Sequence, residues 1–91
     1  MLYVVSYDIP DDRRRLQTAK VLLDFGTRVQ FSVFECVLEG DLYQQLLERL
    51  SGVIQSSEDR LRIYPLCASC TQDVVLLGEG KLTEDPDVYI V

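Results

Sequence analysis

The chain has no histidine and only five glycines among its 91 residues. Without histidine there is no imidazole base and no zinc-bound water of the usual kind, and no glycine-rich phosphate loop is found. Any catalysis must therefore use carboxylates, hydroxyl groups and a metal ion. A disordered chain is also excluded, because 47% of the residues are hydrophobic and five tyrosines and three phenylalanines can build a core.

Long apolar runs and cysteines are scarce as well. No run approaches the roughly 18 apolar residues of a membrane span, and the N-terminus has neither the basic region nor the cleavage site of a signal peptide. We therefore expect a cytoplasmic protein without membrane contact. Because three cysteines are an odd number for a disulfide framework, Cys36, Cys67 and Cys70 are expected to be free thiols.

Basic residues are too few to outweigh the acidic ones, and the net charge of −6 argues against a nucleic-acid partner. The distribution of charge softens this argument. Residues 1–39 hold five basic and six acidic side chains, whereas residues 40–91 hold four and nine, so the net charges are −1 and −5. An arginine-bearing surface from the first half of the chain is therefore possible.

The first 26 residues predict a strand followed by a helix. The β-branched and aromatic segment "LYVVSYDI" is typical of a strand, which Pro10 ends. Asp11 and Asp12 supply the N-cap and a first-turn carboxylate for a helix over residues 12–25, and Gly26 is expected at its C′ position.

The apolar residues of this helix cover a wide arc. Leu16, Ala19 and Leu23 share one face, and further apolar residues lie well round the cylinder. Either the core wraps the helix closely or part of the arc contacts another chain. Arg14 should face solvent, whereas Arg15 flanks the arc and needs an anionic partner.

The middle of the chain predicts a hairpin and a second helix. The segment "RVQFSVFECVLEG" indicates strands over residues 28–30 and 33–39 around a turn at Phe31 and Ser32. "DLYQ" is a capping-box pattern in which Asp41 caps the helix and Gln44 reaches back. The helix should end at Gly52, and its buried stripe consists of Leu42, Leu46, Leu47 and Leu50.

A last strand and a surplus tail complete the chain. "RLRIYPLC" alternates apolar and polar residues, and "DVVLL" and "DVYIV" are further β-like segments. The order predicts an α+β protein of the βαββαβ type, with an antiparallel four-stranded sheet, two helices on one face and a C-terminal β-like extension. We expect one domain over residues 1–78 and a strand-forming tail over 79–91 that packs on the partner subunit of a homodimer.

Asp8 is the first candidate site residue. A carboxylate at the end of an apolar strand can bind magnesium, which prefers oxygen ligands, and a two-fold axis would add a second Asp8. The alternative is an ordinary ion pair with Arg13 or Arg15. The arginines, with Arg28, could bind phosphate, or they could form a solvated helix start balanced by neighbouring aspartates.

The "CASC" segment from Cys67 to Cys70 is the second candidate site. A Cys-x-x-Cys pair can supply half a zinc site or a redox couple. Only Cys36 remains as a third thiolate, so a four-ligand site would need a second subunit. The alternative, which the sequence favours, is a pair of small buried thiols at a strand end.

Three segments together resemble a known family: "YDI" at residues 7–9, the charged helix start "DDRRR", and "RVQFSVFE" at residues 28–35. They resemble the small CRISPR-associated adaptation protein, the subunit that partners the CRISPR integrase, from Leu2 through the region of Cys67. Beyond Gln72 the likeness is one of length and β-like character. The resemblance implies a ferredoxin-like fold, a homodimer and a role in spacer acquisition, in which the dimer bridges integrase subunits and contacts duplex DNA.

The resemblance also implies magnesium-dependent endonuclease activity on RNA or DNA. Asp8 looks like the catalytic, metal-binding aspartate, contributed once by each subunit. The positions of Tyr7, Arg15, Arg28 and Phe34 resemble those that support activity or substrate contact, and Arg13 and Arg14 are further candidates. Because the chain is more acidic than the family leads us to expect, a non-catalytic adaptor that bridges integrase subunits stays open. A ferredoxin-like dimer that senses a metal or a small molecule is a third alternative, based on the fold alone.

Overall fold

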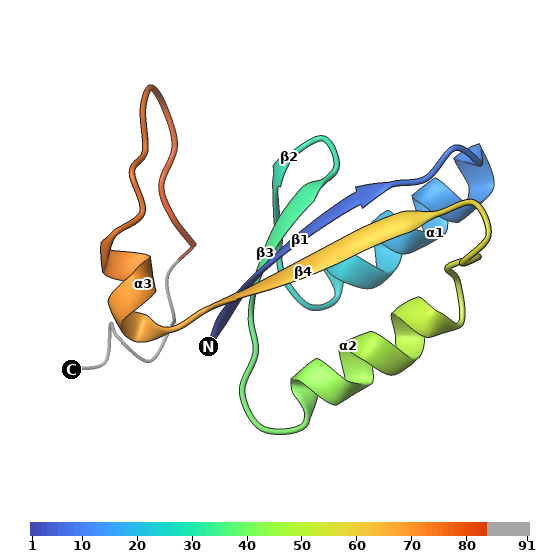
Figure 1. The fold of residues 1–91 in the computed structure, drawn as a ribbon, viewed down its shortest axis with the longest axis horizontal. Coiled ribbons are helices and arrows are strands. Elements are labelled where there is room, and N and C mark those ends of the chain that lie inside the picture. Colours follow the sequence, from blue (N-terminus) through green and yellow to red (C-terminus); the bar gives the residue numbers. More distant parts are fainter. Residues whose placement is uncertain (84–91) are drawn as a thin grey trace.

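The protein is an antiparallel sheet packed against two helices, with a short third helix at the end of the last strand (Figure 1). The computed structural model describes residues 1–83. The sheet order is β2-β3-β1-β4, and every neighbouring pair is antiparallel. The βαββαβ prediction is therefore confirmed. The elements are β1 (Leu2–Asp8), α1 (Asp12–Leu23), β2 (Thr27–Gln30), β3 (Val33–Val37), α2 (Leu42–Ser51), β4 (Arg60–Leu66) and α3 (Ala68–Gln72).

Strand β1 is an inner strand of the sheet, between β3 and β4, and its side chains alternate between the two faces of the sheet. It pairs with β3 from Leu2 opposite Val37, and with β4 from Leu2 opposite Leu66. Because side chains alternate along a strand, Val5 and Tyr7 point toward the helices, and Asp8 points to the opposite, open face. The core lies between the sheet and the two helices and consists of Val5, Tyr7, Ile9, Ala19, Val21, Leu22, Phe34, Cys36, Leu38, Leu46 and Leu50.

Helix α1 begins as predicted and ends earlier than predicted. Asp11 is the N-cap, and its Oδ2 accepts a hydrogen bond of 2.9 Å from the backbone N of Arg14. The helix stops at Leu23 with Asp24 as C-cap, so the prediction of an end at Phe25 with Gly26 at C′ is wrong. Gly26 is required for another reason: a Cβ built there would lie 2.3 Å from the carbonyl oxygen of Glu35.

The buried face of α1 differs from the predicted one. Leu16 is 63% exposed and Leu23 is 56% exposed, and only Ala19 of the predicted face is buried. The buried positions are Thr18, Ala19, Val21 and Leu22. Since the core of this chain does not wrap the helix, the first of the two alternatives is wrong, and the two leucines form an exposed apolar strip.

The hairpin is close to the prediction, whereas the cap of α2 is not. Residues 31 and 32 form the turn, and β3 ends at Val37 instead of Glu39. Asp41 makes no side-chain cap hydrogen bond because its own backbone is already helical, at φ −82° and ψ −3°. Leu42 is exposed, so the buried stripe of α2 is narrower than predicted, although the helix does end at Gly52.

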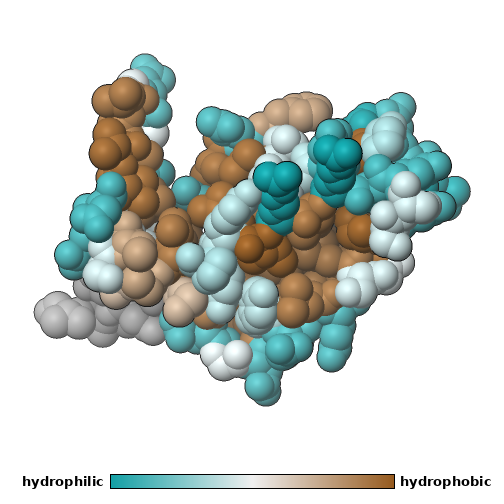
Figure 2. Space-filling view, viewed as in Figure 1, coloured by the Kyte–Doolittle hydropathy of each residue, from teal (hydrophilic) through white to brown (hydrophobic). Residues whose placement is uncertain are grey.

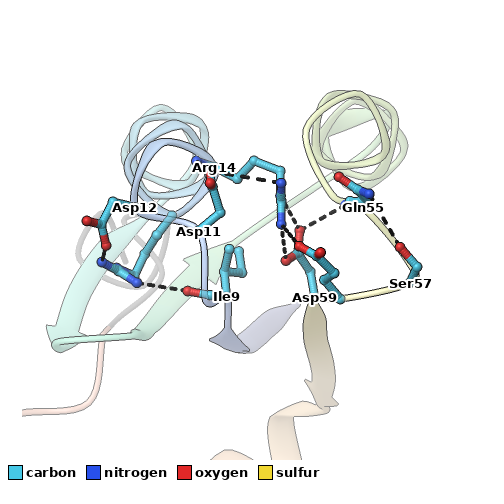
Figure 3. A network of polar contacts seen from close by, with 9 residues as sticks. Ile9, Asp11, Asp12, Arg14, Gln55, Ser57 and Asp59 are labelled. Carbon is cyan, nitrogen blue, oxygen red and sulfur yellow. Dashed lines mark hydrogen bonds and ion pairs between the residues drawn. The ribbon is translucent and has the colours of Figure 1, made fainter.

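Arg14 contradicts the prediction that it faces solvent. Its side chain crosses from α1 to the loop before β4, where it pairs with Asp59 and Glu58 (Figure 3). The Asp59 side chain is inaccessible to solvent. The pairing follows from the rotation of α1 that buries Thr18 and Leu22, because Arg14 lies one turn before Thr18 on the same side.

The segment after β4 was predicted as β-like and is not. Cys67 is the N-cap of the unpredicted helix α3, and residues 74–77 carry no strand. They belong to an arm that projects from the sheet and is largely apolar on its surface (Figures 1 and 2). "DVYIV" lies outside the described residues, so the strand-forming tail over 79–91 and the domain boundary at 78 stay predictions. Among residues 1–83 no helix is long and apolar enough to cross a bilayer.

Candidate functional site

Asp8 lies at the end of β1 on the open face of the sheet, and its side chain is exposed. The β1–β4 register places it opposite Arg60, and it places Ser6 opposite Arg62. Side chains directly opposite each other in an antiparallel pair have Cβ atoms about 5 Å apart. Asp8 is therefore next to cationic side chains from β4.

These residues surround a cavity of about 220 Å³, which is lined by Ser6, Tyr7, Asp8, Arg60, Arg62 and Tyr64. Asp8 forms no ion pair with any residue of 1–83, so the alternative of a structural ion pair with Arg13 or Arg15 is wrong for the described chain. One carboxylate and two guanidinium groups at a single open face can bind an anion such as a phosphodiester through the arginines. The carboxylate remains available as a ligand or base.

Arg60, Arg62 and Tyr64 are further candidate site residues, which the sequence alone did not identify. They occupy alternate positions of β4, and the Nη1 atom of Arg62 lies 3.4 Å from the Tyr64 hydroxyl. A signal was available: in "RLRIY" the polar residues occur at every second position, so they share one face of a strand. The sequence does not give the register between β1 and β4, which places this face of β4 beside Asp8.

The residues of one chain fit half of a magnesium site. Magnesium is usually held by one or two carboxylates with waters and phosphate oxygens, and the Asp8 carboxylate is exposed and unpaired within residues 1–83. The described residues contain no group of three or more carboxylate or thiolate side chains that could hold a metal. Asp8 is the only carboxylate among the described residues that line the cavity, so a two-carboxylate site would need a ligand from another copy of the chain.

The three arginines at the start of α1 have different environments, and only one of them is free among the described residues. Arg15 donates from Nη1 to the carbonyl oxygen of Ile9 at 2.9 Å and pairs with Asp12 (Figure 3), so the expected anionic partner is present. Arg14 is occupied by Asp59 and Glu58. Arg13 is exposed and makes no ion pair within residues 1–83.

Arg28, Tyr7 and Phe34 lie together on the side of the hairpin. The Arg28 guanidinium carbon lies 5.1 Å from the centre of the Phe34 ring, within the range of a cation–π contact. Tyr7 stacks on the same ring with centroids 6.2 Å apart. Tyr7 and Phe34 are buried and Arg28 is exposed, so the two aromatic residues position neighbouring groups, and Arg28 alone of the three presents a charge to solvent.

The cysteines separate into two environments. Cys36 is fully buried, and burial raises the pKa of its thiol to about 11, with a smaller contribution from Glu35. Cys67 and Cys70 are exposed and their Sγ atoms lie 3.3 Å apart. The prediction of buried thiols at the strand end is therefore wrong for this pair, and Cys36 cannot join it as a third ligand because it lies in the core.

Residues 1–74 match the family described as CRISPR associated protein Cas2. Among curated relatives, a CRISPR-associated endoribonuclease Cas2 of Chloroflexus aurantiacus is 50% identical over 93 residues, covering 100% of both chains. A CRISPR-associated endonuclease Cas2 of Thermus thermophilus is 43% identical over 90 residues, covering 99% of this chain and 96% of the relative.

Solved structures of similar chains share the fold, as predicted. Cas2 of Streptococcus pyogenes is similar with a TM-score of 0.74 at 32% identity, covering 86% of this chain and 100% of that one. A chain of a partial Cas6-RT-Cas1–Cas2 complex gives 0.75 at 25% identity, covering 93% of both. The ferredoxin-like α+β fold, the family match over most of the chain and the half-identical relative agree, and this chain therefore belongs to the Cas2 family of CRISPR-associated proteins.

Proposed function

We propose that this chain is a cytoplasmic CRISPR protein of spacer acquisition with magnesium-dependent endonuclease activity on RNA or duplex DNA. The observation that carries the proposal is the exposed Asp8 carboxylate, which has no ion-pair partner within residues 1–83 and borders a cavity that is also lined by Arg60 and Arg62. The names of the relatives, endoribonuclease and endonuclease, support the reaction class and leave the choice of nucleic acid open.

The active form in this proposal is a homodimer. The open face of the sheet carries apolar side chains that are only half-buried in one chain, among them Val4, Val33 and Val37. A second copy packed on this face across a two-fold axis would bury them and would bring a second Asp8 to the first. Two carboxylates with waters and a phosphate oxygen complete the ligand set that one chain lacks.

The roles of the individual residues follow from their positions. Arg60 and Arg62 bind the phosphodiester and neutralise charge that develops on it. Arg28 presents a separate positive charge at the edge strand β2, where it lies over the Phe34 ring on the helix side of the sheet. Tyr7 and Phe34 act as positioning residues, since they are buried and hold the end of β1 and the Arg28 side chain. The two Asp8 carboxylates would hold magnesium, whose chemistry there would be to polarise the phosphodiester and to lower the pKa of a bound water.

Cleavage assays with Asp8→Asn test the enzyme. Wild type and variant are incubated with single-stranded RNA and with duplex DNA, with magnesium and with a chelator, and dimerisation is followed by sedimentation. We expect the variant to lose magnesium-dependent cleavage and to keep the dimer. Asp41→Asn is the matched control, because Asp41 is exposed and its side chain makes no cap hydrogen bond. Equal cleavage by Asp8→Asn, or a wild-type monomer of about 10.4 kDa, would contradict the proposal.

A second function is favoured by one structural neighbour, the chain from a complex whose name includes Cas1 and Cas2. In this role the protein is an adaptor that joins integrase subunits, and the low basicity of its second half suits protein contacts better than phosphate contacts. Deletion of residues 79–91 should then abolish binding to the integrase, while Asp8→Asn leaves spacer acquisition unchanged. Integrase binding that survives the deletion would argue against the role of the tail.

A further inference from the structure

The dithiol at the end of β4 has a geometry that the proposed nuclease does not use. Cys67 and Cys70 are both exposed, and their Sγ atoms lie 3.3 Å apart across the first turn of α3. Hydrogen bonds hold this turn, since the Thr71 N donates to the Cys67 carbonyl at 3.0 Å and the Thr71 hydroxyl donates to the Ala68 carbonyl at 2.7 Å. The two sulfurs are therefore held close together by local backbone structure.

The distance between the sulfurs suits a reversible bond. A disulfide bond is about 2.05 Å long, so the pair must close by only about 1.3 Å, which side-chain rotation provides without moving the strand. Cys36 cannot compete for either partner, because it is fully buried in the core. We propose that Cys67 and Cys70 form a redox-active dithiol, which exchange with low-molecular-weight disulfides converts reversibly to an intramolecular disulfide.

The two thiols differ in the way that such a reaction requires. The Ser69 hydroxyl lies 3.2 Å from the Cys67 sulfur and, with hydrogen bonds from Cys70, lowers the pKa of the Cys67 thiol to about 7. The pKa of the Cys70 thiol is raised by the hydrogen bond to Cys67. Because the thiolate is the attacking species, Cys67 is the nucleophile near neutral pH and Cys70 is the resolving thiol.

The exchange has two balanced steps. The Cys67 thiolate attacks one sulfur of the small disulfide, whose S–S bond breaks, and one small thiolate leaves while Cys67 carries a mixed disulfide. Deprotonated Cys70 then attacks the Cys67 sulfur, which forms the Cys67–Cys70 bond and releases the second small thiolate. Two protein thiols are oxidised, one small disulfide is reduced to two thiols, and the two thiol protons pass to the released sulfurs.

The dithiol and the proposed nuclease site lie at opposite ends of β4. Asp8 is paired with Arg60 at the start of the strand, whereas Cys67 follows Leu66 at its end. Oxidation of the dithiol can therefore be measured independently of nuclease activity, and a negative result for one proposal does not contradict the other. In a reducing compartment the pair should be dithiol at rest and oxidised transiently.

The test uses the full chain, first reduced and then treated with oxidised glutathione. Free thiols are counted by maleimide labelling after denaturation and mass spectrometry. We expect the number of free thiols to fall from three to one, with the label remaining on the peptide that carries Cys36. The oxidised chain should run as a monomer on a non-reducing gel, and dithiothreitol should restore all three thiols. Cys70→Ser should accumulate a glutathione adduct at Cys67, and Cys67→Ser should form an adduct at least about threefold more slowly.

Three results would overturn the proposal. One is a thiol count that stays at three in oxidised glutathione, and another is a disulfide that joins two chains instead of two residues of one chain. The third is stoichiometric zinc in the purified protein that is lost in Cys67→Ser, which would make the pair a metal ligand. Both side chains are exposed, so circular dichroism should find the serine variants folded like wild type.

Discussion

Arg14 and Asp59 form a two-point ion pair between residues 45 positions apart in sequence: Nε lies 2.9 Å from Oδ2, and Nη2 lies 3.1 Å from Oδ1. The same Oδ2 accepts a hydrogen bond of 2.9 Å from the backbone N of Gln55 (Figure 3). The pair ties α1 to the loop that leads into β4, and β4 carries Arg60 and Arg62. The placement of the candidate site thus depends on a contact outside it.

Replacement of Asp59 by Asn should lower the melting temperature by at least about 4 °C, because Arg14 and the Gln55 amide lose an ionised partner in a buried position. Scanning calorimetry or thermal circular dichroism at pH 7 measures the effect. Asp41→Asn is the control and should move the melting temperature by less than about 2 °C. Equal shifts in the two variants would mean that the ion pair does not stabilise the fold.

Because of the ion pair between Arg14 and Asp59, the free energy of unfolding should fall as the pH is lowered. The hydrogen bond from Arg14 holds the pKa of the Asp59 carboxyl below its ordinary value. A carboxyl whose pKa is lower in the folded state stabilises the protein above its unfolded pKa of about 3.9, and this stabilisation is lost as pH falls through the folded-state pKa. Urea unfolding at pH 2 to 5 should therefore have a shallower pH slope in Asp59→Asn than in wild type. Parallel slopes would contradict the assignment.

Replacement of Gly26 by Ala should destabilise the fold by about 1–3 kcal/mol, since the new Cβ would lie 2.3 Å from the Glu35 carbonyl oxygen and 2.5 Å from the Cys36 sulfur. Gly52→Ala is the matched control, because its Cβ would meet nothing closer than 3.5 Å. Denaturant unfolding gives both free energies. A Gly26→Ala variant as stable as Gly52→Ala would show that Gly26 and β3 are farther apart than the structure has them.

Leu22 and Leu23 are adjacent in sequence, but Leu22 is fully buried whereas Leu23 is 56% exposed. Leu22→Ala should cost about 2–5 kcal/mol of unfolding free energy, because it opens a cavity under the sheet. Leu23→Ala should change it by less than about 0.5 kcal/mol. Chemical denaturation measures both, and similar losses would mean that another copy of the chain covers Leu23.

Replacement of Arg62 by Gln should weaken substrate binding more than catalysis if this arginine binds phosphate at the Asp8 cavity. We expect a rise in KM, or in the Kd for nucleic acid measured with Asp8→Asn, and a smaller dependence of that Kd on salt concentration. Lys20→Gln is the control, because Lys20 is exposed on α1 and does not line that cavity. An unchanged Kd in Arg62→Gln would remove Arg62 from the site.

The sequence by itself determined the order of elements and most of their local signals. The strand ending near Asp8, the Asp11 cap, the turn at Phe31 and the end of α2 at Gly52 all depend on residues within a few positions, so hydrophobic period and capping chemistry suffice to predict them. The family resemblance likewise rested on residues close together in the chain, and the relatives confirm it.

Tertiary structure decided everything that depends on how distant segments meet. The rotation of α1 exposes Leu16 and Leu23 and directs Arg14 to Asp59, and the register of β4 sets Arg60 and Arg62 beside Asp8. When the apolar arc of a helix is wide, helical periodicity does not determine how the helix is rotated about its axis. Alternation along a strand likewise does not determine which residue of the neighbouring strand lies opposite. These choices are made by packing over the whole core, because only there do the alternatives differ in buried area and in satisfied hydrogen bonds.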